Sequence, residues 1–123
     1  MKAVDWLTEL ERSGYDTAVG IKIAKLAGDA EFSTYLTVID PGKAVSAHYH
    51  KDGDEHYHII RGQGEMTLTD MVSRLTTTTS VGAQSSFVVP ENTLHQLKNA
   101  GTEPLVLMFS CPQSHLDQDR FLL

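Results

Sequence analysis

Short runs of alternating apolar and polar residues, ended by glycine, proline, asparagine or aspartate, dominate this chain of 123 residues. Such a period of two places one face of a β-strand in a core and the other in solvent. The runs recur about every 8–12 residues, as in β-sandwiches and β-barrels. They are YDTAVGIKIAKLAG (15–28), EFSTYLTVID (31–40), EHYHIIRG (55–62), EMTLTD (65–70), SSFVVP (85–90), HQLKNAG (95–101) and EPLVLMFSCP (103–112). A further run, LTTTTS (75–80), is rich in β-favouring threonine and predicts an exposed strand. Because no helical pattern of about 10–15 residues alternates with these runs, a parallel α/β sheet is disfavoured.

The two ends of the chain lack this alternation. Residues 1–14 predict a short helix that Asp5 caps and Gly14 ends. Its partial apolar stripe consists of Trp6, Leu7 and Leu10. A helix this short needs a surface to pack against.

We expect one domain over residues 1–123, with the barrel at 15–112 and a tail at 113–123. The tail, QSHLDQDRFLL, is either a docked segment or a last short helix. Three of its side chains could close over the barrel mouth: His115, Asp117 and Arg120. Our expectation is nevertheless a solvated tail.

Charge and composition exclude several classes of partner and location. The net charge is −6, from 16 acidic and 10 basic residues, with no basic cluster. Such a chain repels nucleic acid phosphates and anionic membranes, so we expect neither as a partner. The single cysteine, Cys111, permits no intrachain disulfide and is interpreted as a small buried apolar residue. With no signal-peptide or membrane-spanning pattern, a cytoplasmic protein is expected.

Four of the six histidines lie in the segment HYHKDGDEHYH, residues 48–58. Residues i and i+2 of a strand share a face, so His48 and His50 point the same way as a pair of imidazoles. KDGD turns the chain, and Glu55 can then return a carboxylate to the pair. His95, after the turn VVPENT, is the candidate third imidazole. Three imidazoles and a carboxylate suit one divalent transition metal, namely Fe, Mn, Co, Ni or Zn.

Strand parity leaves two interpretations of the second half of this segment. Glu55, Tyr57 and Ile59 share one face, and His56 and His58 share the other. If Glu55 faces the metal, His56 and His58 face away from it. The same alternation also allows His56 and His58 to be the imidazole pair instead, with Glu55 outside the site.

The segment resembles the first motif of the cupin family. That motif is a glycine, five residues, H-x-H, three or four residues, a glutamate, six residues and a glycine. Gly42, His48, His50, Glu55 and Gly62 occupy every fixed position at these spacings. The match is specific by the standard of short motifs.

The second cupin motif is similar to the segment around His95. It reads glycine, five residues, P-x-G, two residues, histidine, three residues and asparagine. Pro90, His95 and Asn99 fill it, with two departures. Asn92 replaces a glycine but tolerates left-handed backbone geometry, and Gly82 precedes Pro90 by seven residues rather than five. Neither departure touches His95.

The resemblance implies an all-β fold, a double-stranded β-helix (jelly-roll) barrel, which here carries the short N-terminal helix. It also implies a metal inside the barrel. The implied ligands are His48, His50, Glu55 and His95. Because small single-domain cupins are commonly dimers, a homodimer is expected.

Strand parity also predicts where the side chains of the remaining candidate residues lie. Tyr57 and Ile59 are expected to line the barrel beside the glutamate, and Leu97 to share the face of the third histidine. His56 and His58 are expected at the surface or at a subunit interface.

For function, the resemblance implies a metal-dependent cupin that acts on a small polar molecule, as an oxygenase, isomerase, decarboxylase or lyase. No general base is identifiable. The alternative is a non-catalytic small-molecule-binding or sensor barrel, in which the metal is structural or captures the ligand. A purely structural, metal-free barrel is a third possibility. A titratable group beside the metal would favour an enzyme, and a wholly apolar lining would favour binding.

Overall fold

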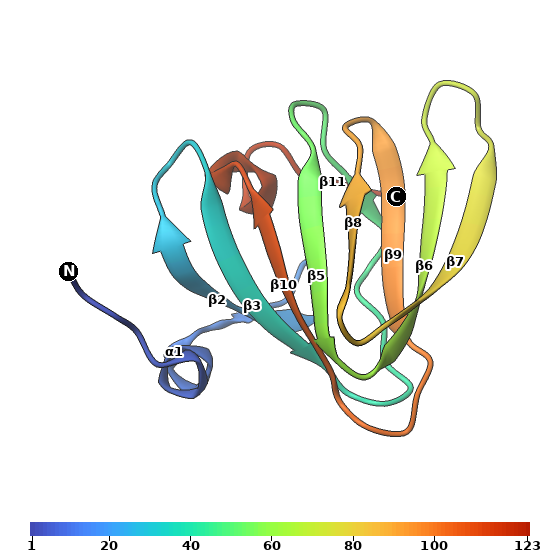
Figure 1. The fold of residues 1–123 in the computed structure, drawn as a ribbon. Coiled ribbons are helices and arrows are strands. Elements are labelled where there is room, and N and C mark those ends of the chain that lie inside the picture. The colour runs from blue at the N-terminus through green and yellow to red at the C-terminus, as the bar shows by residue number, and fades with distance from the viewer.

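The computed structural model describes residues 1–123 as two antiparallel β-sheets that face each other (Figure 1). The six-stranded sheet, in spatial order, comprises β1 (Tyr15–Asp16), β2 (Ile21–Gly28), β3 (Ser33–Ile39), β10 (Leu105–Cys111), β5 (Glu55–Arg61) and β8 (Ser85–Val89). The five-stranded sheet comprises β11 (Phe121–Leu122), β4 (His48–Tyr49), β9 (Thr93–Asn99), β6 (Gln63–Asp70) and β7 (Thr76–Gly82). After β3 the chain crosses between the sheets at every connection except the β6–β7 hairpin. The expected all-β double-stranded β-helix is thus confirmed.

The core fills the space between the sheets because the strands bury alternate residues. In β9, for example, Thr93, His95, Leu97 and Asn99 are buried, and the residues between them are more exposed. Leu105 and Leu107 of β10 are almost completely buried. A leucine buried to this degree contributes about 1.5–3 kcal/mol through the hydrophobic effect. The threonine-rich β7 is exposed along most of its length, as predicted.

Three left-handed backbone positions match the motif pattern, and the first is Gly42, with φ of 78°. Gly62, between β5 and β6, has φ of 93°, and a Cβ there would lie 2.7 Å from the carbonyl oxygen of Pro104. Only glycine fits this close approach, which accounts for the glycine that ends the first motif. Asn92 has φ of 55°, so asparagine does adopt the left-handed geometry expected of it.

The N-terminal helix α1 (Trp6–Arg12) begins as predicted, since the Asp5 carboxylate accepts a hydrogen bond from the Thr8 amide at 2.9 Å. It ends at Arg12, slightly before Gly14, with Ser13 as its C-cap. The helix lies beside β2 but has no buried residue, and Trp6 remains half exposed. No helix of this chain is long and apolar enough to cross a membrane.

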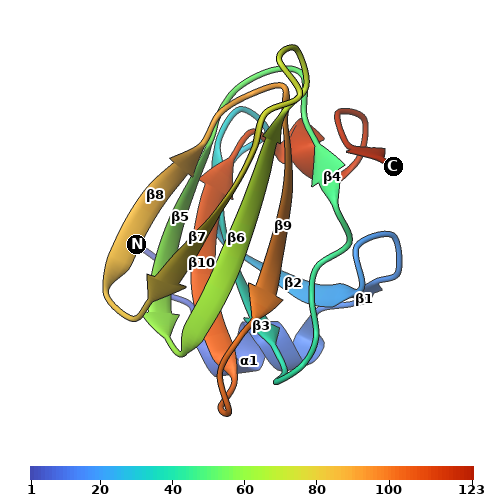
Figure 2. The ribbon, with the colours of Figure 1, turned by 90° about the vertical axis from the view of Figure 1, so that its right-hand side faces the viewer.

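The C-terminal segment 113–123, called here the C-terminal strap, docks on the barrel beside β4 (Figure 2). It consists of a 3₁₀ turn, η1 (Gln113–Leu116), and β11, which pairs with β4. His115 is 1% exposed, and Arg120 forms an ion pair with Asp16 at 2.7 Å. The expectation of a solvated tail is therefore wrong for His115 and Arg120, although Asp117 is exposed. Alternation could not reveal this docking, because the strap contains only a two-residue strand and a single turn.

Candidate metal centre

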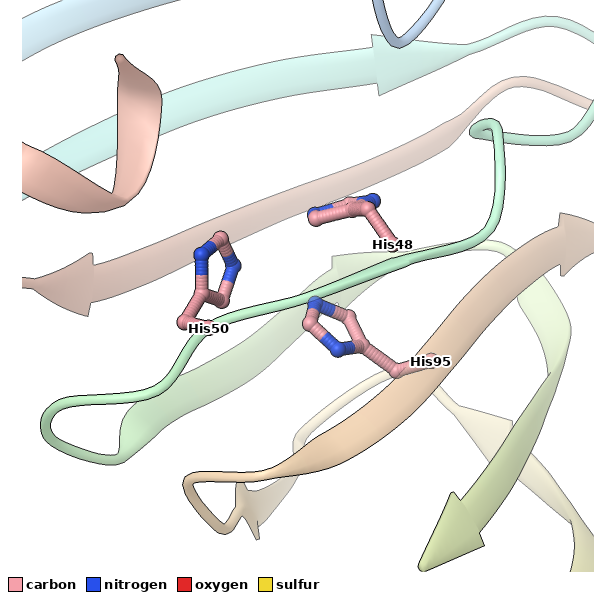
Figure 3. Close-up of side chains that lie close together, drawn as sticks. All are labelled: His48, His50 and His95. Carbon is pink, nitrogen blue, oxygen red and sulfur yellow. The ribbon is translucent and has the colours of Figure 1, made fainter. Parts of the chain in front are cut away.

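Three histidines converge inside the barrel (Figure 3). His48 lies in β4, His50 follows two residues later, and His95 lies opposite His48 in β9. The ring centroids are 4.3 Å apart for His48 and His95 and 5.0 Å apart for His48 and His50. One ring nitrogen from each of the three histidines lies within 4.8 Å of the other two. All three side chains are buried, so the strand parity predicted for His48 and His50 holds.

Backbone carbonyls fix the tautomer of all three rings. Each Nδ1 contacts a carbonyl oxygen: Ser46 for His48 (2.7 Å), Asp119 for His50 (2.5 Å) and Thr93 for His95 (3.0 Å). Because a carbonyl only accepts, each Nδ1 carries the hydrogen and donates it. The neutral ring then keeps a free lone pair on Nε2. This is the usual arrangement of histidines that ligate a metal through Nε2.

Two of these Nε2 atoms are buried without a hydrogen-bond partner, those of His50 and His95. A buried, unsatisfied polar group costs about 1–3 kcal/mol. Burial, together with the proximity of His95, lowers the pKa of His48 to about 4. His48 is therefore neutral near pH 7, the state in which imidazole binds a metal.

Glu55, the first residue of β5, brings the only carboxylate into this cluster. Its oxygens lie 3.2 Å from Nε2 of His50 and 3.4 Å from Nε2 of His95, without the alignment of a hydrogen bond. A nitrogen lone pair facing a carboxylate oxygen at this distance is repulsive unless a cation lies between them, either a proton or a metal ion. The buried donor set of three imidazole nitrogens and one carboxylate therefore fits a divalent transition metal.

The environment of Glu55 keeps it ionised. Burial alone raises the pKa of Glu55, but the hydrogen bond from His115 leads the contacts that outweigh burial and hold that pKa well below its usual range. The hydroxyl of Tyr57 also donates to Oε1 at 3.1 Å. Burial and the nearby charge of Glu55 raise the pKa of Tyr57, so the phenol stays protonated as a donor.

His115 groups with His50 and Glu55, although the sequence led us to expect it in a solvated tail. Its Nδ1 lies 2.9 Å from Oε2 of Glu55, and its Nε2 lies 2.6 Å from the carbonyl oxygen of Asp52. Its ring stacks on that of His50 at 4.0 Å, with an interplanar angle of 4°. Burial lowers the pKa of His115, but its hydrogen bonds to Glu55 and Asp52 outweigh burial and raise it above the usual value. No motif marks this residue, which lies 60 positions from Glu55.

The four predicted ligands therefore do not form one closed group. His48, His50 and His95 are together, whereas Glu55 groups with His50 and His115. His50 belongs to both groups, and the carboxylate of Glu55 also reaches the first group, since it lies 3.4 Å from Nε2 of His95.

A cavity of about 30 Å³ adjoins the cluster. That is room for about two water molecules. The predicted residues Tyr57 and Leu97 line it. Ile59 is buried on the same face of β5 but packs in the hydrophobic core and is not part of the cavity wall. The rest of the wall is mostly apolar, with Ile21 and Phe109 among its members.

His56 and His58 point away from the cluster, because β5 alternates between buried and exposed residues. His58 bonds the Ser86 hydroxyl at 2.8 Å, and His56 lies beside Phe32. The alternative that these two histidines form the imidazole pair is thus not what the structure adopts.

We expect the double variant His56→Gln/His58→Gln to keep the metal content of the parent, measured by elemental analysis. A folded double variant that has lost metal would contradict this prediction.

Cys111 is fully buried, in agreement with its interpretation as a small apolar residue. Burial and the nearby charge of Glu55 raise the pKa of this thiol, so it stays protonated. It is therefore not a nucleophile in this site.

Comparison with known proteins agrees with this geometry. Residues 35–111 match the family described as "Cupin domain". A mannose-1-phosphate guanylyltransferase of Sinorhizobium fredii is 31% identical over 94 residues, which cover 76% of this chain and 17% of that protein. The chain thus spans less than a fifth of this curated relative.

Solved structures share the fold at lower identity. Bacillus subtilis oxalate decarboxylase, a protein with Mn(II) centres, superposes with a TM-score of 0.75 at 23% identity, over 94% of this chain and 31% of that one. An uncharacterised conserved protein with a double-stranded β-helix domain from Klebsiella pneumoniae superposes with a TM-score of 0.74 at 15% identity, over 99% and 96%. Because the family model matches most of the barrel and the fold agrees with it, the chain belongs to the cupin family.

Proposed function

We propose that this protein is a metal-dependent cupin that binds and acts on a small polar molecule inside the barrel. His48, His50, His95 and Glu55 would hold one divalent transition metal. The observation that carries the proposal is the convergence of three buried imidazoles. The Nδ1 atom of each donates a hydrogen bond to a backbone carbonyl. Such second contacts orient metal-binding histidines in proteins.

The donor set restricts the metal. Three imidazole nitrogens and one carboxylate oxygen suit Fe, Mn, Co, Ni or Zn rather than Ca or Mg, which prefer oxygen ligands. The Mn(II) centres named for the Bacillus subtilis oxalate decarboxylase make manganese a sensible first metal to test. Because that protein is only 23% identical, it supports the choice of metal for the test and not a reaction.

The surroundings of the site support chemistry on a small oxygen-containing ligand. A divalent metal held here would polarise a carbonyl, carboxylate or enediol oxygen. The chain itself contributes a mostly apolar wall that limits water, and the protonated Tyr57 hydroxyl as a donor beside Glu55. These features are compatible with oxygenation, isomerisation, decarboxylation and lyase chemistry.

Two observations bear on the choice between an enzyme and a binding protein. The titratable groups of Tyr57 and His115 contact Glu55, which favours an enzyme. The small and mostly apolar cavity favours the alternative, a barrel that only captures a ligand. We propose the enzyme because both titratable groups contact the carboxylate of the site itself.

The first test of the proposal is metal content. Gently purified protein should carry close to one divalent metal per chain, because the three imidazoles of His48, His50 and His95 converge once in each barrel. Elemental analysis, repeated after reconstitution with Fe, Mn, Co, Ni and Zn, measures this. Failure of every metal to bind stoichiometrically would reject the site.

The second test separates an enzyme from a binding protein. The metal-loaded protein would be incubated with a panel of small carboxylates, hydroxy acids and dicarbonyls, and each compound would be followed by mass spectrometry. Conversion of a compound by the parent and not by His48→Ala supports an enzyme. Binding with quantitative recovery of the unchanged compound supports the ligand-binding alternative.

A further inference from the structure

We propose that His115 is a positioning residue of the metal centre, which holds the Glu55 carboxylate where it can complete the ligand set. The inference rests on the metal site proposed above. It assigns a role to the C-terminal strap, which neither of the two cupin motifs includes.

The contact between His115 and Glu55 is short and shielded from water. Nδ1 of His115 lies 2.9 Å from Oε2 of Glu55, and the two side chains are 0% and 4% exposed. The other ring nitrogen donates to the carbonyl oxygen of Asp52 at 2.6 Å. Both partners are acceptors, so the ring donates from both nitrogens, which only a protonated imidazole can do. Its stacking on His50 fixes the plane of the ring as well.

This ring completes the set of donors around Glu55. Tyr57 donates to Oε1, and His115 donates to Oε2. Each oxygen thereby has one fixed donor and keeps lone-pair directions free for a metal ion. Without His115, Oε2 loses its hydrogen-bond donor, and the glutamate is freer to turn about its own side-chain bonds. Hydrogen bonds to a ligating carboxylate are a common means of orienting it toward a metal.

The strap that carries His115 is anchored independently of that residue. The carboxylate of Asp119 accepts hydrogen bonds from the amides of Lys51 and Asp52 at 2.7 and 2.9 Å. The pairing of β11 with β4 and the ion pair of Arg120 with Asp16 add two further anchors. His115 can therefore be substituted while the strap stays docked. The strap also supplies the carbonyl oxygen of Asp119 that orients His50, so it contacts two of the four proposed ligands.

Three substitutions of His115 separate positioning from packing. The amide of asparagine reaches the place of Nδ1, next to Glu55, whereas the amide of glutamine reaches the place of Nε2, next to Asp52. Leucine fills the space and donates nothing. We expect metal affinity to fall by about 10–100-fold in His115→Leu, the range typical of lost contacts to a metal ligand. His115→Asn should recover part of this loss, and His115→Gln should recover less.

The measurement uses Co(II) as the probe. Competition titration against a chelator gives the affinity, and the visible absorption spectrum of bound Co(II) reports its coordination without any activity assay. His115→Leu should shift the spectrum, and His115→Asn should return it toward that of the parent. His58→Leu, the same change at an exposed histidine, is the matched control and should alter neither affinity nor spectrum.

Four outcomes would overturn the inference. Parent-like affinity and spectrum in folded His115→Leu would show that His115 does not position Glu55, and tighter binding would show that it competes with the metal. If His115→Leu fails to fold, the comparison of Asn with Gln decides, and a Gln variant that binds as tightly as the Asn variant overturns the inference. A parent protein that takes up neither Co(II) nor any of Fe, Mn, Ni and Zn overturns the metal site and this inference together. If the parent takes up Co(II) and His115→Leu binds it with unchanged affinity, only the inference is overturned and the metal site stands.

Discussion

His48→Ala should lose stoichiometric metal binding. Loss of a contact to a metal ligand can reduce metal affinity roughly 100-fold, and loss of the ligand itself should reduce it further. His48 pairs with His95 across β4 and β9, and its Nε2 is one of three converging nitrogens. Glu55→Gln should weaken binding less, because it keeps the size and one acceptor oxygen while removing the charge. Three neutral imidazoles can still bind a transition metal, so Zn or Ni should lose least and Mn most.

Competition titrations against a chelator would rank the two variants, with His58→Ala as the matched control at an exposed histidine of β5. Thermal unfolding of each metal-free variant would show that the barrel is intact. If Glu55→Gln binds every metal as tightly as the parent, Glu55 is not a ligand. The site would then be a three-histidine centre with Glu55 outside it, still bonded to His115.

Asn99→Ala should destabilise the fold by about 2–5 kcal/mol, although Asn99 belongs to a motif of a metal-binding family. The side-chain amide donates to the carbonyl oxygens of Ile39 and Glu103, each at 2.8 Å. Its oxygen accepts from the amide of Gly101 at 2.8 Å. Asn99 is 2% exposed, so alanine leaves backbone groups near the end of β3 and in the β9–β10 turn without partners. A buried group left unsatisfied costs about 1–3 kcal/mol.

Urea unfolding of metal-free protein would measure the effect. Gln96→Ala, at an exposed position of the same strand, is the matched control and should change stability by no more than about 0.5 kcal/mol. The folded Asn99→Ala protein should keep the parent metal affinity, because its hydrogen bonds lie in the turn and not at the cluster. A loss of stability below about 1 kcal/mol would show that water or neighbouring groups replace all three bonds.

The local periodicity of the sequence was sufficient to predict most of the fold and the shared face of the histidine pair. Strand geometry alone places His48 and His50 on one face, and the same alternation separates Glu55 from His56 and His58. Which of the two faces of β5 points inward was open on parity alone. The spacing of the first motif favoured Glu55, and the burial of Glu55 and Tyr57 agrees with it.

The hydrogen-bond partners of Glu55, by contrast, could not be predicted from the sequence, because they depend on how the barrel closes. His115 reaches Glu55 across 60 residues, and Asn99 reaches Ile39 across the same separation. No repeat or spacing encodes such a contact, because it exists only once β4, β5 and the strap have been brought together by the packing of the two sheets. The alternation of a strand is a property of neighbouring residues and can be read along the chain. The partner of a buried carboxylate is a property of the closed barrel, where burial requires each polar group to find whichever partner the fold brings within reach.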